Sequence, residues 1–150
     1  MQNIVSFVEV ENYISRVYAG KRCAVKPFYI PFDFGDFAAA ASSVTVQQRI
    51  PSNADFILMR MSFSRQIEDP LNLTTIQFID GGTNEQFFPS PVIAELVCDT
   101  LTFGMRDQSV FRRLAGSSVI SGTLTSTGVS AFNNAIITMA GVLVYVYSGQ

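Results

Sequence analysis

Hydrophobic residues recur at every second position through most of the chain beyond residue 40, which is the spacing of half-buried β-strands. Turn residues separate these stretches, as at Pro51-Ser52-Asn53 and Thr127-Gly128. The predicted strands cover residues 42–50, 54–65, 73–80, 110–114, 117–126 and 134–147. Short strands at this spacing are typical of an all-β protein, either an antiparallel β-sandwich or a barrel.

Three stretches within this region need a local interpretation. Residues 92–98, VIAELVC, fit either a short strand or a helical turn. Gly122 interrupts a strand, which indicates either a β-bulge or the close approach of another element. The segment from Asp80 to Glu85 is rich in oxygen ligands, but it lacks the alternating ligands and the final Glu of an EF-hand, so a hairpin turn is predicted there.

The first 35 residues follow a different pattern. We expect residues 1–35 to form an N-terminal arm or segment and residues 36–150 to form the sandwich domain. Apolar residues at helical spacing indicate a short amphipathic helix in residues 7–18, although the SFVEVENYI stretch fits a strand nearly as well. Pro27 and Pro31 predict an extended stretch, because the residue before a proline avoids helical backbone angles. The FDFGDF sequence that follows predicts a turn.

The last predicted strand is apolar on both of its faces. Ile137 and Tyr145 share one face with further apolar residues, and Val142 and Val144 lie on the other. No charged residue follows Arg113, although soluble monomers commonly protect their sheets with charges. A strand buried on both faces needs a cover on each side. The opposing sheet provides one cover, and either the N-terminal segment or a neighbouring subunit provides the other.

These features predict a subunit interface on the last strand. Arginine is enriched at the energetic centres of interfaces, so one residue of the Arg112-Arg113 pair is a candidate anchor. The two side chains point to opposite faces of a strand, and a solvated pair is the alternative interpretation. The candidate interface residues are Arg112, Arg113, Ile137, Val142, Val144 and Tyr145.

Composition argues against most catalytic chemistry. The chain has no His, which excludes Ser-His-Asp and Cys-His nucleophile systems and His-ligated metal sites. Its two cysteines, Cys23 and Cys98, match no metal motif, and we expect two reduced, partly buried thiols. We therefore predict no catalytic, cofactor-binding or metal-binding residues and no cofactor.

Charge and hydropathy also bear on the partners. Ten basic and twelve acidic residues give a net charge of −2, without the basic excess that is typical of nucleic-acid binding. The most apolar run, residues 135–147, is shorter than the roughly 20 residues that a membrane-spanning helix needs. We expect neither a nucleic acid nor a membrane as partner.

Two segments resemble a known class of proteins. The first is VTVQQRIPSNADFILMRMSFS at residues 44–64, and the second is FRRLAGSSVISGTLTSTGVSAFNNAIITMAGVLVY at residues 111–145. They resemble small β-sandwich virion proteins of tailed bacteriophages, in Ala54-Asp55-Phe56, in residues 114–117 and in Gly141 with Val144-Tyr145. The resemblance implies a jelly-roll-like fold and a structural role in the phage particle as a decoration or cement subunit, and it brings no catalytic residues.

The function expected from these observations is a non-enzymatic structural protein located in the virion. Its expected partners are further copies of itself, as a homotrimer, and the major capsid protein or other virion proteins. One alternative is a receptor- or glycan-binding module of a phage tail or spike, with its site in residues 32–37 or 84–88. The other is a carboxylate glycosidase using Glu68, Asp69 and Asp99, against which solvated surface carboxylates are the simpler interpretation.

Overall fold

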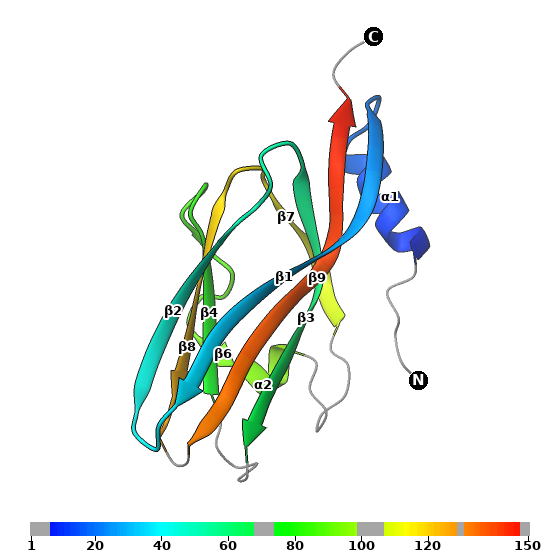
Figure 1. Ribbon diagram of the computed structural model, residues 1–150. Coiled ribbons are helices and arrows are strands. Elements are labelled where there is room, and N and C mark those ends of the chain that lie inside the picture. Colours follow the sequence, from blue (N-terminus) through cyan, green and yellow to red (C-terminus); the bar gives the residue numbers. More distant parts are fainter. Residues whose placement is uncertain (1–6, 68–73, 99–106, 129–130, 148–150) are drawn as a thin grey trace.

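A computed structural model describes residues 7–67, 74–98, 107–128 and 131–147 of the 150-residue chain. Two antiparallel sheets pack face to face as a sandwich, and one short helix lies on the outer side of one sheet (Figure 1). The elements are α1 Phe7–Val17, β1 Arg22–Phe37, β2 Ser42–Arg49, β3 Asp55–Ile67, β4 Thr74–Asp80, β5 Glu85–Gln86, β6 Val92–Ile93, α2 Ala94–Val97, β7 Asp107–Leu114, β8 Val119–Ser126 and β9 Phe132–Tyr147. The predicted all-β class is confirmed.

The strands pair in a nested order. β1 pairs with β9, β2 with β8, β3 with both β7 and β9, and β4 with β8, β5 and β6. Sheet A therefore has the order β1-β9-β3-β7, and sheet B has the order β2-β8-β4-β5 with β6 beside β4. Such nesting arises when one long antiparallel ribbon rolls up into two sheets, which is the jelly-roll arrangement. The jelly-roll-like sandwich that was expected is the observed fold.

The core lies between the two sheets and is dominated by phenylalanine. Alternate residues of each strand point inward, as the period of two requires. Phe32 stacks on Phe34 and meets the edge of Phe78 from the opposite sheet, with ring centroids 6.5 and 5.1 Å apart. Aromatic pairs in these geometries add roughly 0.5–1.5 kcal/mol beyond the area that they bury. The many phenylalanines therefore fill the interior.

The segment that the sequence set apart as an arm contributes a full strand to this core. The predicted boundary between residues 35 and 36 falls inside β1, which pairs with β9 from Arg22 to Phe37. Of the two alternatives for residues 7–18, the helix is the one observed, as α1, and the predicted turn at residues 32–37 is wrong. Phe34 and Phe37 are buried, and Gly35 has a φ of 76° between two register shifts, so bulges let the strand continue where a turn was expected.

Other local predictions can be judged directly. Asp80 ends β4 and accepts a hydrogen bond from the Gly82 N–H in the predicted hairpin turn. Residues 92–98 contain both of the predicted alternatives, because the short strand β6 is followed directly by the helical turn α2. Gly122 pairs without a register shift, and a Cβ there would lie 2.6 Å from the Phe78 ring, so close approach is the reason for glycine. Both cysteines are free thiols, as predicted.

Candidate assembly surface

The helix α1 covers the upper part of sheet A on the side away from sheet B (Figure 1). Its residues Val10 and Ile14, with Tyr18 just beyond its end, recur at helical spacing and are buried against the sheet. The strand residues beneath them are Ile57, Val142 and Val144. Of the two covers that the sequence left open for the last strand, the N-terminal segment is the one observed over this half.

A polar cluster fastens the end of α1 to the sheet. The Tyr18 hydroxyl donates to Asp55 Oδ2 at 2.7 Å, and the Arg113 guanidinium donates to the same oxygen at 2.9 and 3.0 Å. The other oxygen, Asp55 Oδ1, accepts from the Gly116 N–H at 3.0 Å. The helix, β3 and the end of β7 thus share one carboxylate.

This geometry shifts the titration of all three side chains. Burial alone would raise the pKa of Asp55, but hydrogen bonds from Tyr18, Gly116 and Arg113 outweigh burial and hold that pKa below its ordinary value. Burial and the adjacent Asp55 carboxylate raise the pKa of Tyr18 well above its ordinary value. The hydrogen bond to Asp55 raises the pKa of Arg113. The charged carboxylate, the neutral phenol and the charged guanidinium are therefore the stable forms of this cluster.

The six residues expected at a subunit interface lie in different places. Ile137 is in the core between the sheets, and Val142 and Val144 lie beneath α1, so one chain already buries all three. Tyr145 is half-buried, with Lys26 Nζ 5.6 Å from its ring centroid. The structure does not bring these residues together on one open surface, because the burial that the sequence indicated comes from α1 and the opposing sheet.

The arginine pair divides between two faces, as predicted. Arg113 points to the Asp55 cluster on the α1 side, with its guanidinium 5.3 Å from the Tyr18 ring centroid. Arg112 lies over the Phe87 ring at 4.3 Å and donates to the Phe87 carbonyl oxygen. Each guanidinium is thus occupied within its own chain.

Below α1, the outer face of sheet A has no covering element among the described residues. Cross-strand register places three rows of three residues on this face, each crossing β1, β9 and β3. The rows are Tyr29–Ala140–Arg60, Pro31–Thr138–Ser62 and Asp33–Ile136–Ser64. We call these nine residues the sheet A patch. Charges occupy only two corners, and Tyr29 at a third corner is 63% exposed.

The outward side chains of β9, the central strand of the sheet A patch, are partly buried between the adjacent strands β1 and β3. Ile136, Thr138 and Ala140 are each of intermediate burial, between the exposed Pro31 on one side and the exposed Ser62 and Ser64 on the other. Tyr29 and Arg60 are residue types that are enriched at the centres of protein interfaces, and the patch contains no Lys or Glu, which are depleted there. The sequence analysis missed this surface because Tyr29 and Pro31 were assigned to an arm.

The outer face of sheet B has a different character. Hydroxyl and amide side chains of β2 and β8 pair across the strands, in Ser43–Thr125 at 2.8 Å, Thr45–Thr123 at 2.9 Å and Gln47–Ser121 at 3.1 Å. These side chains form hydrogen bonds with one another, so this part of the face is polar and uncharged, with the exposed Arg49 at the end of β2. It provides a matched comparison for the sheet A patch.

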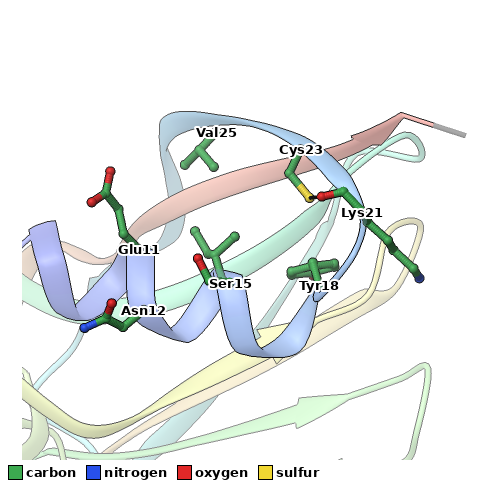
Figure 2. A pocket seen from close by; sticks show the side chains of 8 residues that line it. Glu11, Asn12, Ser15, Tyr18, Lys21, Cys23 and Val25 are labelled. Carbon is green, nitrogen blue, oxygen red and sulfur yellow. Dashed lines mark hydrogen bonds between the residues drawn. The ribbon is translucent and has the colours of Figure 1, made fainter. Parts of the chain in front are cut away.

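A shallow hollow of about 480 Å³ lies between α1 and the start of β1 (Figure 2). Glu11 and Ser15 come from the helix, and Lys21, Cys23 and Val25 come from the turn and the strand. The Cys23 thiol lies 3.8 Å from the Lys21 carbonyl oxygen. Tyr18 also lines the hollow but is buried, and Glu11 is the one carboxylate among its lining residues.

The sites expected for the alternative functions are not formed as predicted. The aromatic side chains of residues 32–37 are buried in the core as part of β1, and in the second candidate segment Phe87 is buried and Phe88 is half-buried, so neither segment presents an exposed aromatic platform. The carboxylates Glu68, Asp69 and Asp99 lie outside the described residues. Within the described ranges, no three His, Cys, Asp or Glu side chains gather as metal ligands. No helix there is long and apolar enough to cross a membrane.

Comparisons with known proteins add a weak structural likeness. No protein-family model matches the chain, and no curated protein matches it. The chain is weakly similar to a chain in the structure of infectious bursal disease virus strain Gx, with 13% sequence identity and a TM-score of 0.26. The match covers 83% of this chain and 40% of the viral chain, so this chain spans less than half of the length of its counterpart. The case for function therefore rests on the surfaces of the chain itself.

Proposed function

We propose that the protein is a non-enzymatic structural subunit of a bacteriophage particle, which decorates or cements the capsid through β-sandwich contacts with its own copies and with other virion proteins. The observation that carries this proposal is the sheet A patch, an uncovered and almost uncharged face over the central strand β9. The jelly-roll arrangement is compatible with it, because this fold recurs in viral capsid domains, although it also recurs in lectins. The resemblance of residues 44–64 and 111–145 to phage virion proteins supports the particle assignment.

Assembly through this face has a simple energetic basis. Apolar surface removed from water contributes roughly 25 cal/mol per Å², from which the cost of association must be subtracted. Burying the patch desolvates few charged residues, because Asp33 and Arg60 at two of its corners are the charged residues among the nine. A cement subunit that binds only the assembled shell stabilises that shell by mass action.

Thr138 at the centre of the patch allows a direct test. Thr138→Glu places a charge on the outer face of β9 without touching the core, and we expect it to prevent self-association and binding to capsids. Thr123→Glu is the matched control, since Thr123 is an equally half-buried threonine on the outer face of the central strand β8. Substitution of Ile137 or Val144 by Asp is a poor test, because both side chains are buried within one chain.

Light scattering and co-sedimentation with capsids provide the two measurements. The proposal predicts that Thr138→Glu lowers the mass in solution and the capsid-bound fraction, while Thr123→Glu changes neither. If the two folded variants assemble and bind equally well, the sheet A patch is not the contact surface.

A further inference from the structure

The edge of β1 shows which of its backbone groups are free. The Pro31 carbonyl oxygen accepts a hydrogen bond from Gln48 Nε2 of β2 at 2.8 Å, so this carbonyl points away from β9. Backbone direction alternates along an antiparallel strand, and the register with β9 is unbroken from Arg22 to Asp33. The other odd-numbered residues of this stretch therefore also direct their N–H and C=O groups away from the sheet.

Proline protects only part of this edge. Pro27 and Pro31 have no N–H to offer, and prolines on edge strands block pairing with another strand. Before Pro27, the two outward-facing residues Cys23 and Val25 both have an N–H group that points away from β9. The open stretch of the β1 edge is thus Lys21 to Val25, with free N–H groups at Cys23 and Val25, while the Lys21 N–H donates to the Tyr18 carbonyl oxygen. These residues also form one wall of the hollow beside α1.

The two walls of this hollow carry opposite charges at opposite ends. α1 runs towards the turn at Gly20 and β1 runs back from it, so Glu11 lies at the Val25 end and Lys21 lies at the turn end (Figure 2). Neither Glu11 nor Lys21 forms an ion pair with another described residue. Reversal of the strand direction would bring the two charges together.

We propose that a second copy of this chain binds here, with its β1 edge antiparallel to the first and a two-fold axis at Cys23. A two-fold contact is self-complementary, so residue 21 of each copy lies opposite residue 25 of the other. Lys21 of one copy then meets the end of the hollow where Glu11 of the other copy lies. The outward groups of Cys23 and Val25 complete a ladder that joins two four-stranded sheets into one.

The inference rests on the proposed function in one respect, because it names a second copy as a partner of the assembling subunit. It uses a different surface, since the edge at Lys21–Val25 is separate from the sheet A patch. The edge contact joins two copies through β1, whereas the proposed function joins copies through the sheet A patch. The two contacts can therefore fail independently.

Cross-linking at Cys23 tests the edge contact. Cys98 is fully buried and Cys23 is half-exposed, so a short bismaleimide added to the folded full-length chain reports on Cys23. The parent for the series carries Cys98→Ser, and Cys23→Ser is the negative control. We expect a covalent dimer from the parent at protein concentrations where Cys23→Ser gives none.

Val25→Pro removes one outward donor from each copy, and Pro27 and Pro31 already occupy equivalent positions on this strand. We expect this variant to cross-link at least about tenfold more slowly, because two hydrogen bonds across the contact are lost. A urea unfolding curve checks that it is folded. Lys21→Glu and Glu11→Lys are each expected to slow cross-linking, and the double variant is expected to restore it.

Each outcome decides the proposal. If the parent and folded Val25→Pro cross-link at equal rates, the cross-link reports random collision and the edge contact is overturned. The edge contact is also overturned if neither Lys21→Glu nor Glu11→Lys changes the rate of cross-linking. A cross-linked dimer that persists in Thr138→Glu supports the edge contact even if the sheet A patch fails. Loss of mass in Thr138→Glu with no Cys23 cross-link in the parent overturns the edge contact and leaves the proposed function standing.

Discussion

Replacement of Asp55 by Asn is expected to destabilise the chain by about 2 kcal/mol at pH 7. The substitution keeps the shape of the side chain and removes its charge. The Tyr18 hydroxyl loses a charged acceptor at 2.7 Å, and a hydrogen bond to a charged group is worth about 1.5–3 kcal/mol. The Arg113 pair adds at most about 1 kcal/mol, because the Arg113 side chain is half-exposed. The bond from Gly116 survives, since the amide that replaces the carboxylate still offers an oxygen to the Gly116 N–H.

The pH dependence fixes the sign of this effect. The pKa of Asp55 is lower in the folded chain than in the unfolded chain, so the folded state favours the charged carboxylate. Its contribution is fully present above the unfolded value of about 3.9 and is lost as the pH falls through the folded pKa. The stability difference between the natural chain and Asp55→Asn should therefore narrow steadily as the pH is lowered below about 4.

Urea unfolding at a fixed protein concentration measures this difference, at pH 7 and at several pH values below 4. In thermal unfolding at pH 7, the midpoint temperature should also fall by about 4–8 °C, which is the range expected for a loss of about 2 kcal/mol in a domain of this size. Asp36→Asn is the control, because Asp36 is exposed and accepts one hydrogen bond, from the Asn134 N–H. Equal stability of Asp55→Asn and the natural chain at pH 7, or a difference that does not narrow in acid, would refute this reasoning.

Two further substitutions probe the sandwich itself. Glu95→Gln removes the charged partner of Arg65 from the buried Arg65–Glu95 ion pair, and Glu95 also accepts a hydrogen bond from Thr74. Thermal unfolding should show that the free energy of unfolding falls by about 3–5 kcal/mol. A loss below about 1 kcal/mol would contradict burial of the pair. Gly122→Ala forces a methyl group towards the Phe78 ring and should cost about 1–3 kcal/mol in urea unfolding, and a neutral effect would show that the ring moves aside freely.

The sequence predicted the fold class well because the strands alternate so regularly. Period-two patterns place Ile76, Phe78 and their counterparts in the core, and turn residues mark most of the strand ends. The N-terminal segment was harder to predict, because residues 1–35 were treated as one arm, whereas they contain the helix α1 and most of the strand β1. The local sequence from Phe32 to Phe37 favours a turn, and only long-range pairing with β9 makes it a strand with bulges.

The candidate surface was less predictable than the fold. The apolar character of Val142 and Val144 correctly indicated a cover on the outer face, but the sequence does not say which element supplies it. The sheet A patch joins residues from three strands that are far apart in the chain, such as Tyr29, Ser62 and Thr138. Alternation shows which side of its own strand each residue occupies, whereas register decides which residues become neighbours.

The mass of the unaltered chain in solution, followed by light scattering over a range of concentrations, tests the central claim most directly. The central claim is that the chain assembles with further copies of itself through the sheet A patch. It predicts a species larger than the 16.5 kDa monomer, with a trimer at about three times that mass as the expected closed ring. A mass of 16.5 kDa at every concentration would contradict self-assembly.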